Sequence, residues 1–144
     1  MNKEDKELLL KDLCARLPYG VYVEHTSGFR GTLHDLTVYF TYNDDDSIKD
    51  YMCYTNFFGD VACNLEFFKP YLFPMSSMTE EQKEEYHYIV NYISPDDTDN
   101  WREGEFIYVY QMTALLHFYL KNHLDYMNLI PLGLAIDATG MNIY

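Results

Sequence analysis

The hydrophobic and polar positions of the chain change their period twice, and these changes separate a first helix, a set of strands and a helical half. Leucines recur at helical spacing over residues 3–16 with charged side chains mostly between them, which predicts an amphipathic helix. Acidic residues near its start and Arg16 near its end suit the helix dipole. Because Pro18 disfavours helical backbone at the preceding residue, we expect the helix to end at about Leu17.

From Gly20 onward the apolar residues alternate with polar ones, and β-branched and aromatic side chains become frequent, as is typical of strands. Turns rich in glycine, aspartate or asparagine separate these runs. We expect four strands, at residues 21–25, 32–42, 48–57 and 61–68. Short strands joined by tight turns predict an antiparallel meander. We favour a small SH3-like barrel over a strongly twisted sheet.

Residues 69–82 join this β region to the helical half. Pro70 and Pro74 cannot donate hydrogen bonds to a strand ladder, so we expect the sheet to end here or to present an edge. The phrase Thr79-Glu80-Glu81-Gln82 fits a capping box and predicts the start of a helix. An overlapping match begins at Ser77, so the two candidate starts differ by two residues.

The C-terminal half predicts two helices and an apolar tail. The first helix ends at Ser94-Pro95, and residues 96–104 form an acidic, turn-rich connector. Residues 106–122 are apolar on nearly all sides, which indicates a central helix. Asn122-His123 is a candidate C-cap. The apolar tail at residues 129–136 is expected to lie in a groove, and the alternative is a tail that stays exposed and prone to association.

These elements predict an α+β fold in a single domain. A chain of 144 residues fits one domain with a shared core. We expect a helix-plus-β subdomain at residues 1–68, the connecting stretch at 69–82 and a helical subdomain at 83–144.

The composition narrows the classes of partner. The chain is 48% hydrophobic and 17% aromatic, with 15 tyrosines, so it should fold and should carry rings at the core edge or along a groove. Its net charge of −13 argues against direct binding to nucleic acid or to anionic membranes. The same charge favours basic partners. A protein that imitates the charge of nucleic acid is an alternative.

Cysteine usage and the N-terminus predict a cytoplasmic protein. The three cysteines, Cys14, Cys53 and Cys63, lack a paired spacing, which argues against a disulfide framework or a zinc site. The charged N-terminal residues do not resemble a signal peptide. No apolar run approaches the roughly 20 residues that span a bilayer.

The catalytic and ligand-binding motifs that we sought are absent from the sequence. There is no phosphate-binding glycine loop, no nucleophile elbow and no His-Glu-x-x-His. His117 and His123 are six residues apart, which does not place them on one helix face. The run Asp44-Asp45-Asp46 lacks the remaining ligands of a calcium loop. A nucleophile and base among His25, His34 and Cys53 have no supporting spacing. We therefore expect no metal, no cofactor and no enzymatic activity.

Several phrases of the chain resemble a known group of proteins. They are Glu7 to Val21 (ELLLKDLCARLPYGV), Lys69 to Glu81 (KPYLFPMSSMTEE), Leu120 to Tyr126 (LKNHLDY) and Ile130 to Ala135 (IPLGLA). Together they are similar to a family of small uncharacterised proteins common in gut Bacteroidales and in their phages and prophages. That family usually has Tyr-Arg-Gly-Leu-Ile where this chain has Tyr126-Met127-Asn128-Leu129-Ile130, so no role of the arginine carries over. The resemblance implies a cytoplasmic, mobile-element setting and supplies no activity or cofactor.

The leading functional hypothesis is a non-enzymatic binding protein with an acidic, tyrosine-rich surface that engages a host or phage protein. A host-defence or regulatory factor is a reasonable class of target. We expect the surface to lie beside residues 69–82, and its candidate rings are Tyr71, Phe73, Trp101, Tyr108 and Tyr126.

Two other functional hypotheses stay open. One is a nucleotide or small-molecule module that stacks a base between rings, with phosphates held by some of Lys69, Arg102, Arg30 and Lys121. The other is a hydrolase or transferase, which would have to gather histidines and carboxylates from distant segments.

Overall fold

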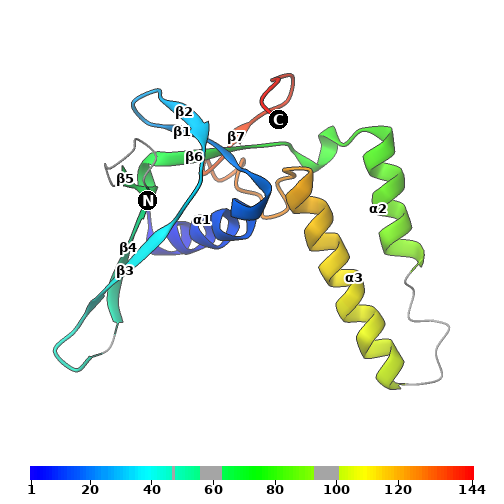
Figure 1. The fold of residues 1–144 in the computed structure, drawn as a ribbon, viewed down its shortest axis with the longest axis horizontal. Helices are drawn as coiled ribbons and strands as arrows, with labels where there is room; N and C mark the ends of the chain where they lie inside the picture. The colour runs from blue at the N-terminus through cyan, green and yellow to red at the C-terminus, as the bar shows by residue number, and fades with distance from the viewer. Residues whose placement is uncertain (47, 56–62, 93–100) are drawn as a thin grey trace.

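The computed structural model describes residues 1–46, 48–55, 63–92 and 101–144, and for residues 48–54, 63, 92 and 101–108 it describes the backbone alone. The chain folds into an N-terminal helix, two small sheets and a pair of helices (Figure 1). The helices are α1 (Lys3–Arg16), α2 (Glu80–Tyr92) and α3 (Trp101–Lys121), and the short 3-10 helices are η1 (Leu17–Tyr19), η2 (Leu65–Phe67) and η3 (Met75–Ser77). The strands are β1 (Tyr22–His25), β2 (Arg30–Thr32), β3 (Thr37–Tyr42), β4 (Ile48–Thr55), β5 (Cys63–Asn64), β6 (Phe68–Leu72) and β7 (Ile136–Asp137).

The α+β class is confirmed, but the expected SH3-like barrel is not, because the strands lie in two open sheets. One sheet has the order β2-β1-β6-β7 and the other β3-β4-β5. Residues 33–36 interrupt the strand expected at 32–42, so its first part pairs with β1 and its second part with β4. The β3–β4 hairpin therefore extends away from the first sheet (Figure 1), and no closed ring of strands forms in the described part of the chain.

The first helix has the bounds that its sequence predicts. Asn2 caps α1 by accepting a hydrogen bond from the amide of Asp5 at 2.8 Å. The chain then tightens into η1 at Pro18, and Gly20 takes a left-handed conformation with φ of 74°. Leu9 and Leu13 are fully buried, so the leucine stripe faces the core as its spacing indicates.

The connecting stretch is not an edge of the sheet, contrary to the expectation from its prolines. Strand β6 lies between β1 and β7 and runs from the first sheet to the helical pair (Figure 1). Pro70 lies opposite Val23, an odd-numbered residue of β1. His25 in β1 and Val21 just before it form their backbone hydrogen bonds on the β2 side. Because alternate residues of a strand bond to the same side, Val23 also bonds toward β2. Pro70, opposite Val23, therefore lies at a position without a ladder hydrogen bond to β1. The pairing with β7 begins only after the proline, at Tyr71.

The apolar tail lies in the main core, as its composition predicts. Leu129 and Ala138 are fully buried and Leu134 nearly so. Strand β7 extends the sheet in parallel with β6. The core joins both ends of the chain and includes the buried residues Leu9, Leu13, Val21, Val23, Leu33, Leu65, Phe68, Leu72, Leu129, Leu134 and Ala135.

The helical pair begins at the predicted capping box. The amide of Thr79 donates to Gln82 Oε1 at 2.9 Å, and the amide of Gln82 donates to Thr79 Oγ1 at 3.2 Å. The two helices lie side by side (Figure 1) and share a second core built on Ile89, Phe118 and Leu124. Helix α3 begins at Trp101 rather than near residue 106, so part of the expected connector is helical.

Candidate functional site

One side of α3 packs against α2. Phe118 is fully buried in the core between the two helices. The side-chain amide of Gln111 donates to the carbonyls of Ile89 at 3.2 Å and Val90 at 2.9 Å, and so satisfies carbonyls near the end of α2. This side of α3 is fixed in place by both packing and hydrogen bonds.

The opposite side of α3 exposes an apolar stripe, which we call the α3 face: Val109, Met112, Thr113 and Leu116. These residues have the i, i+3, i+4, i+7 spacing of one helix face. Val109, Met112 and Leu116 are 62%, 51% and 42% exposed. The hydroxyl of Thr113 donates to the carbonyl of Val109 at 2.9 Å, so its polar group is already bonded within the helix.

The expectation that α3 is a central helix is therefore wrong, because its neighbours leave the α3 face uncovered. Only its C-terminal end meets the N-terminal segment, where Leu120 is buried and the hydroxyl of Tyr19 lies 2.8 Å from His117 Nδ1. The preceding two turns have no such cover in the described part of the chain. An apolar sequence on all sides marks a helix that can be buried, but it does not show that a neighbour is present.

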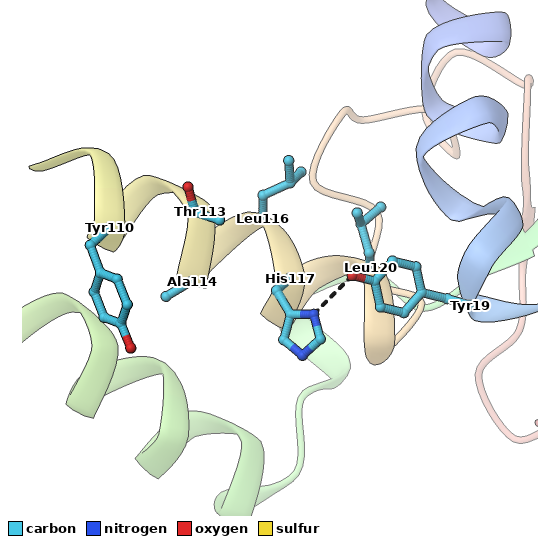
Figure 2. Close-up of a pocket in the computed structure, with 7 residues that line it drawn as sticks. All are labelled: Tyr19, Tyr110, Thr113, Ala114, Leu116, His117 and Leu120. Carbon is cyan, nitrogen blue, oxygen red and sulfur yellow. Dashed lines mark hydrogen bonds between the residues drawn. The ribbon is translucent and has the colours of Figure 1, made fainter.

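The first of two hollows beside the α3 face lies between α3 and η1 and has a volume of about 400 Å³. Figure 2 shows Tyr110 at one end and Tyr19 at the other, with His117 between them. The rings of Tyr19 and His117 are 5.5 Å apart, centroid to centroid. Their hydrogen bond closes one end of the hollow, and the rest of the lining comes from Thr113, Ala114, Leu116 and Leu120.

The second hollow, of about 370 Å³, lies on the other flank of the ridge formed by Thr113 and Leu116. Its rings are Tyr119 and Tyr126, which stack with centroids 5.4 Å apart and planes 10° apart. Burial raises the pKa of Tyr119 from 10 to about 12, with a further contribution from Tyr86, so this phenol keeps its proton even at a pH where an exposed tyrosine ionises. The hollow is lined by Met112, Thr113, Leu115, Leu116, Tyr119 and Tyr126.

The α3 face carries no charged residue, although the chain as a whole is strongly acidic. Residues 109–120 contain no Lys, Arg, Asp or Glu. Lys121, directly after them, pairs with Glu85 of α2 at 2.5 Å. Among the described side chains, five basic residues bind carboxylates in this way: Lys6, Arg16, Arg30, Lys83 and Lys121. The uncharged stripe thus belongs to a chain whose carboxylates greatly outnumber its remaining cations.

Of the five expected ring residues, the structure describes the side chains of three and brings one of them, Tyr126, to this site. Tyr126 lines the second hollow. Tyr71 is buried in β6 and its hydroxyl donates to Glu24, so it is part of the core. Phe73 is half-buried against the second core and the ring of Tyr144. The side chains of Trp101 and Tyr108 lie outside the described residues.

Two of the four cations proposed to hold phosphates are already paired with carboxylates. Arg30 Nε binds Glu24 at 2.6 Å, and Lys121 binds Glu85. Lys69 is exposed on β6, and the side chain of Arg102 lies outside the described residues. The nucleotide hypothesis therefore has no assembled phosphate site among the described side chains.

The candidate catalytic and metal residues are likewise dispersed where the structure describes them. His25 Nδ1 lies 2.6 Å from Ser27 Oγ in the β1–β2 turn, and the side chain of Cys53 is outside the described residues. Within the described ranges, no three histidine, cysteine or acidic side chains gather closely enough to bind a metal ion.

A buried charged pair was not expected from the sequence. Arg16, assigned only to the helix dipole, is fully buried, and its Nε and Nη2 donate to Asp12 at 2.6 and 2.9 Å. Nη2 also donates to the carbonyl of Leu124 at 2.8 Å, which ties α1 to the segment after α3. The i, i+4 spacing of Asp12 and Arg16 indicated an ion pair, but their burial depends on distant residues.

Comparison with known proteins yields no relative: no protein-family model matches the chain, and no curated protein or solved structure matches it. The helices in the described ranges are all too short or too polar to cross a membrane. The geometry of the α3 face is therefore the main guide to function.

Proposed function

We propose that the protein is a non-enzymatic binding protein that engages another protein through the α3 face and its two hollows. The observation that carries this proposal is the uncovered stripe of Val109, Met112 and Leu116 on a helix whose other side is firmly packed. Contiguous apolar side chains in water mark interaction surfaces more often than isolated ones do. A rigid helix also presents them with little loss of conformational freedom on binding.

The setting of the proposal comes from the sequence resemblance to proteins of gut Bacteroidales and their phages. In that setting the partner is a host or phage protein, and a host-defence or regulatory factor is a reasonable class. The net charge of −13 adds that the partner surface should be neutral or basic. Tyr126 is the residue from the sequence-based set that takes part in this surface.

Site-specific photo-crosslinking tests the proposal. A photoreactive amino acid replaces Met112 in one variant and Leu132 in another; both positions are about half exposed, and Leu132 lies in the turn before β7. In a lysate of the host, we expect a discrete crosslinked species from position 112 that position 132 does not give. Identical background patterns from both positions would refute protein binding at this face.

A small-molecule function is the second candidate, and the first hollow favours it. Its volume of about 400 Å³ lies in the range of ligand pockets, and Tyr19, Tyr110 and His117 offer rings and polar atoms to a flat ligand. Thermal-shift screening with aromatic compounds and nucleotides tests it. A ligand at 100 times its dissociation constant should stabilise the fold by about 2.7 kcal/mol. A His117→Ala variant should lose that response, measured as the shift from its own unliganded melting temperature.

A further inference from the structure

We propose that the α3 face receives an amphipathic α-helix of the partner, with lysine or arginine flanking the apolar residues of that helix. This inference rests on the proposed function and specifies the chemistry of the partner. It also excludes a second copy of this chain as the main occupant.

The shape of the surface favours a helix. The exposed stripe from Val109 to Leu116 covers about two turns, or roughly 10 Å along α3. A ridge of Thr113 and Leu116 separates the two hollows, and both residues line both of them. Helices pack by placing a ridge of one into the groove of the other. A partner helix laid along α3 could therefore place side chains in both hollows at once.

The net charge of the chain favours a cationic partner. The apolar centre carries no charge, while the chain as a whole has 23 acidic and 10 basic residues. Lysine or arginine flanking the apolar stripe of a partner helix would be attracted by the net negative charge of the chain, whereas acidic flanks would be repelled.

The same charge disfavours self-association through this face. Two copies would each bring a net charge of −13 to a small interface. Salt distinguishes the two occupants, because screening weakens attraction between opposite charges and weakens repulsion between like charges. Added salt should thus loosen a cationic helix but would promote a dimer of this chain.

Two synthetic peptides probe the occupant directly on the full chain. Each is an amphipathic helix of about 18 residues, roughly 27 Å long, with leucine at alternating third and fourth positions. The other positions are mainly lysine in one peptide and glutamate in the other. Fluorescence anisotropy should show the lysine peptide binding at least about tenfold more tightly than the glutamate peptide at about 50 mM salt, with a smaller difference at about 500 mM.

Matched variants separate docking on the α3 face from general charge attraction. The M112E/L116E variant and the control L132E/M141E each replace one Met and one Leu and add the same two negative charges. The control positions, 54% and 45% exposed, resemble the test positions in exposure. We expect M112E/L116E to weaken the lysine peptide by about tenfold or more, although its added charge alone would strengthen binding. The control should keep or slightly gain affinity, and circular dichroism should show both variants folded.

Three results would overturn the inference. Equal affinity of the two peptides would remove the cationic preference, and equal loss or gain in both variants would remove the α3 face as the docking site. Sedimentation showing a dimer that strengthens with salt and is abolished by M112E/L116E would make a second copy the occupant. A specific crosslink from position 112 to a partner without a cationic helix would refute this inference and leave the proposed function intact.

Discussion

Acid should destabilise the protein through His123, which stays neutral in the folded state. This residue ends α3 in a left-handed conformation with φ of 52°. The amide of Leu124 donates to the carbonyl of Tyr119 and the amide of His123 to that of Leu120, which together cap the helix. The imidazole is buried and stacks on Tyr144, with centroids 3.5 Å apart. Its Nδ1 has no hydrogen-bond partner among the described residues.

Burial, with a further contribution from the nearby Arg16 guanidinium, lowers the pKa of His123 from 6.5 to about 4. In the unfolded chain the imidazole binds a proton below about pH 6.5, whereas in the folded protein it resists protonation until about pH 4. The unfolded state therefore gains protons first, and stability falls as the pH drops through this window. One pKa unit corresponds to about 1.4 kcal/mol, so the loss approaches about 3 kcal/mol at most.

The assay is urea unfolding at several pH values for the wild type and for His123→Asn. Asparagine tolerates the left-handed conformation and does not titrate. The free energy of unfolding of the wild type, minus that of the variant, should fall by about 3 kcal/mol between pH 7 and pH 4. Subtracting the variant removes the contribution of the carboxylates, which titrate in both proteins. Parallel pH curves, or a folded-state pKa of His123 near 6.5 by NMR titration, would refute the reasoning.

Three further predictions concern stability and are measured by urea unfolding unless stated otherwise. Arg16→Met leaves Asp12 buried without its partner and should cost about 3–5 kcal/mol, while D12L/R16M should recover most of the loss; equal stability of both variants would contradict the pairing. Phe118→Ala opens a cavity between α2 and α3 and should cost about 3–5 kcal/mol, and a loss below about 1 kcal/mol would contradict its burial. Thr79→Ala removes one half of the capping box and should cost about 1 kcal/mol, with faster amide exchange confined to the first turn of α2; unchanged exchange there would argue against the cap.

The sequence predicts the elements of this fold best where the signal is local. The bounds of α1 follow from a leucine stripe and Pro18, and the start of α2 follows from Thr79 and Gln82. The left-handed end of α3 at His123 was also a candidate from sequence. Each of these features depends on residues within one or two turns, and the same side chains make the same bonds in almost any tertiary context.

The sequence predicts poorly the features that depend on which elements meet. Pro70 was expected at a sheet edge, but its strand β6 lies between β1 and β7. This is possible because Pro70 occupies a position where no ladder hydrogen bond to β1 is needed and the pairing with β7 begins after it. Nothing near α3 in the sequence shows that its Val109–Leu116 side would lack a cover. Of the candidate rings, Tyr71 is part of the core, whereas Tyr126 is half-buried and lines a hollow. Their local sequences do not distinguish these outcomes, because burial is decided by distant segments.

The links between the two ends of the chain have a consequence for the order of folding. Arg16 of α1 bonds to Leu124, 108 residues away, and β6 bonds to β7 across 65 residues at Tyr71 and Ile136. Contacts of such long range form slowly, because a large loop must close before they contribute. The α2–α3 pair, whose partners are close in sequence, can form earlier. During synthesis α1 can pack against the strands that follow it, but the core around its leucines stays incomplete until the last part of the chain arrives, and until then it is partly exposed to chaperones and proteases.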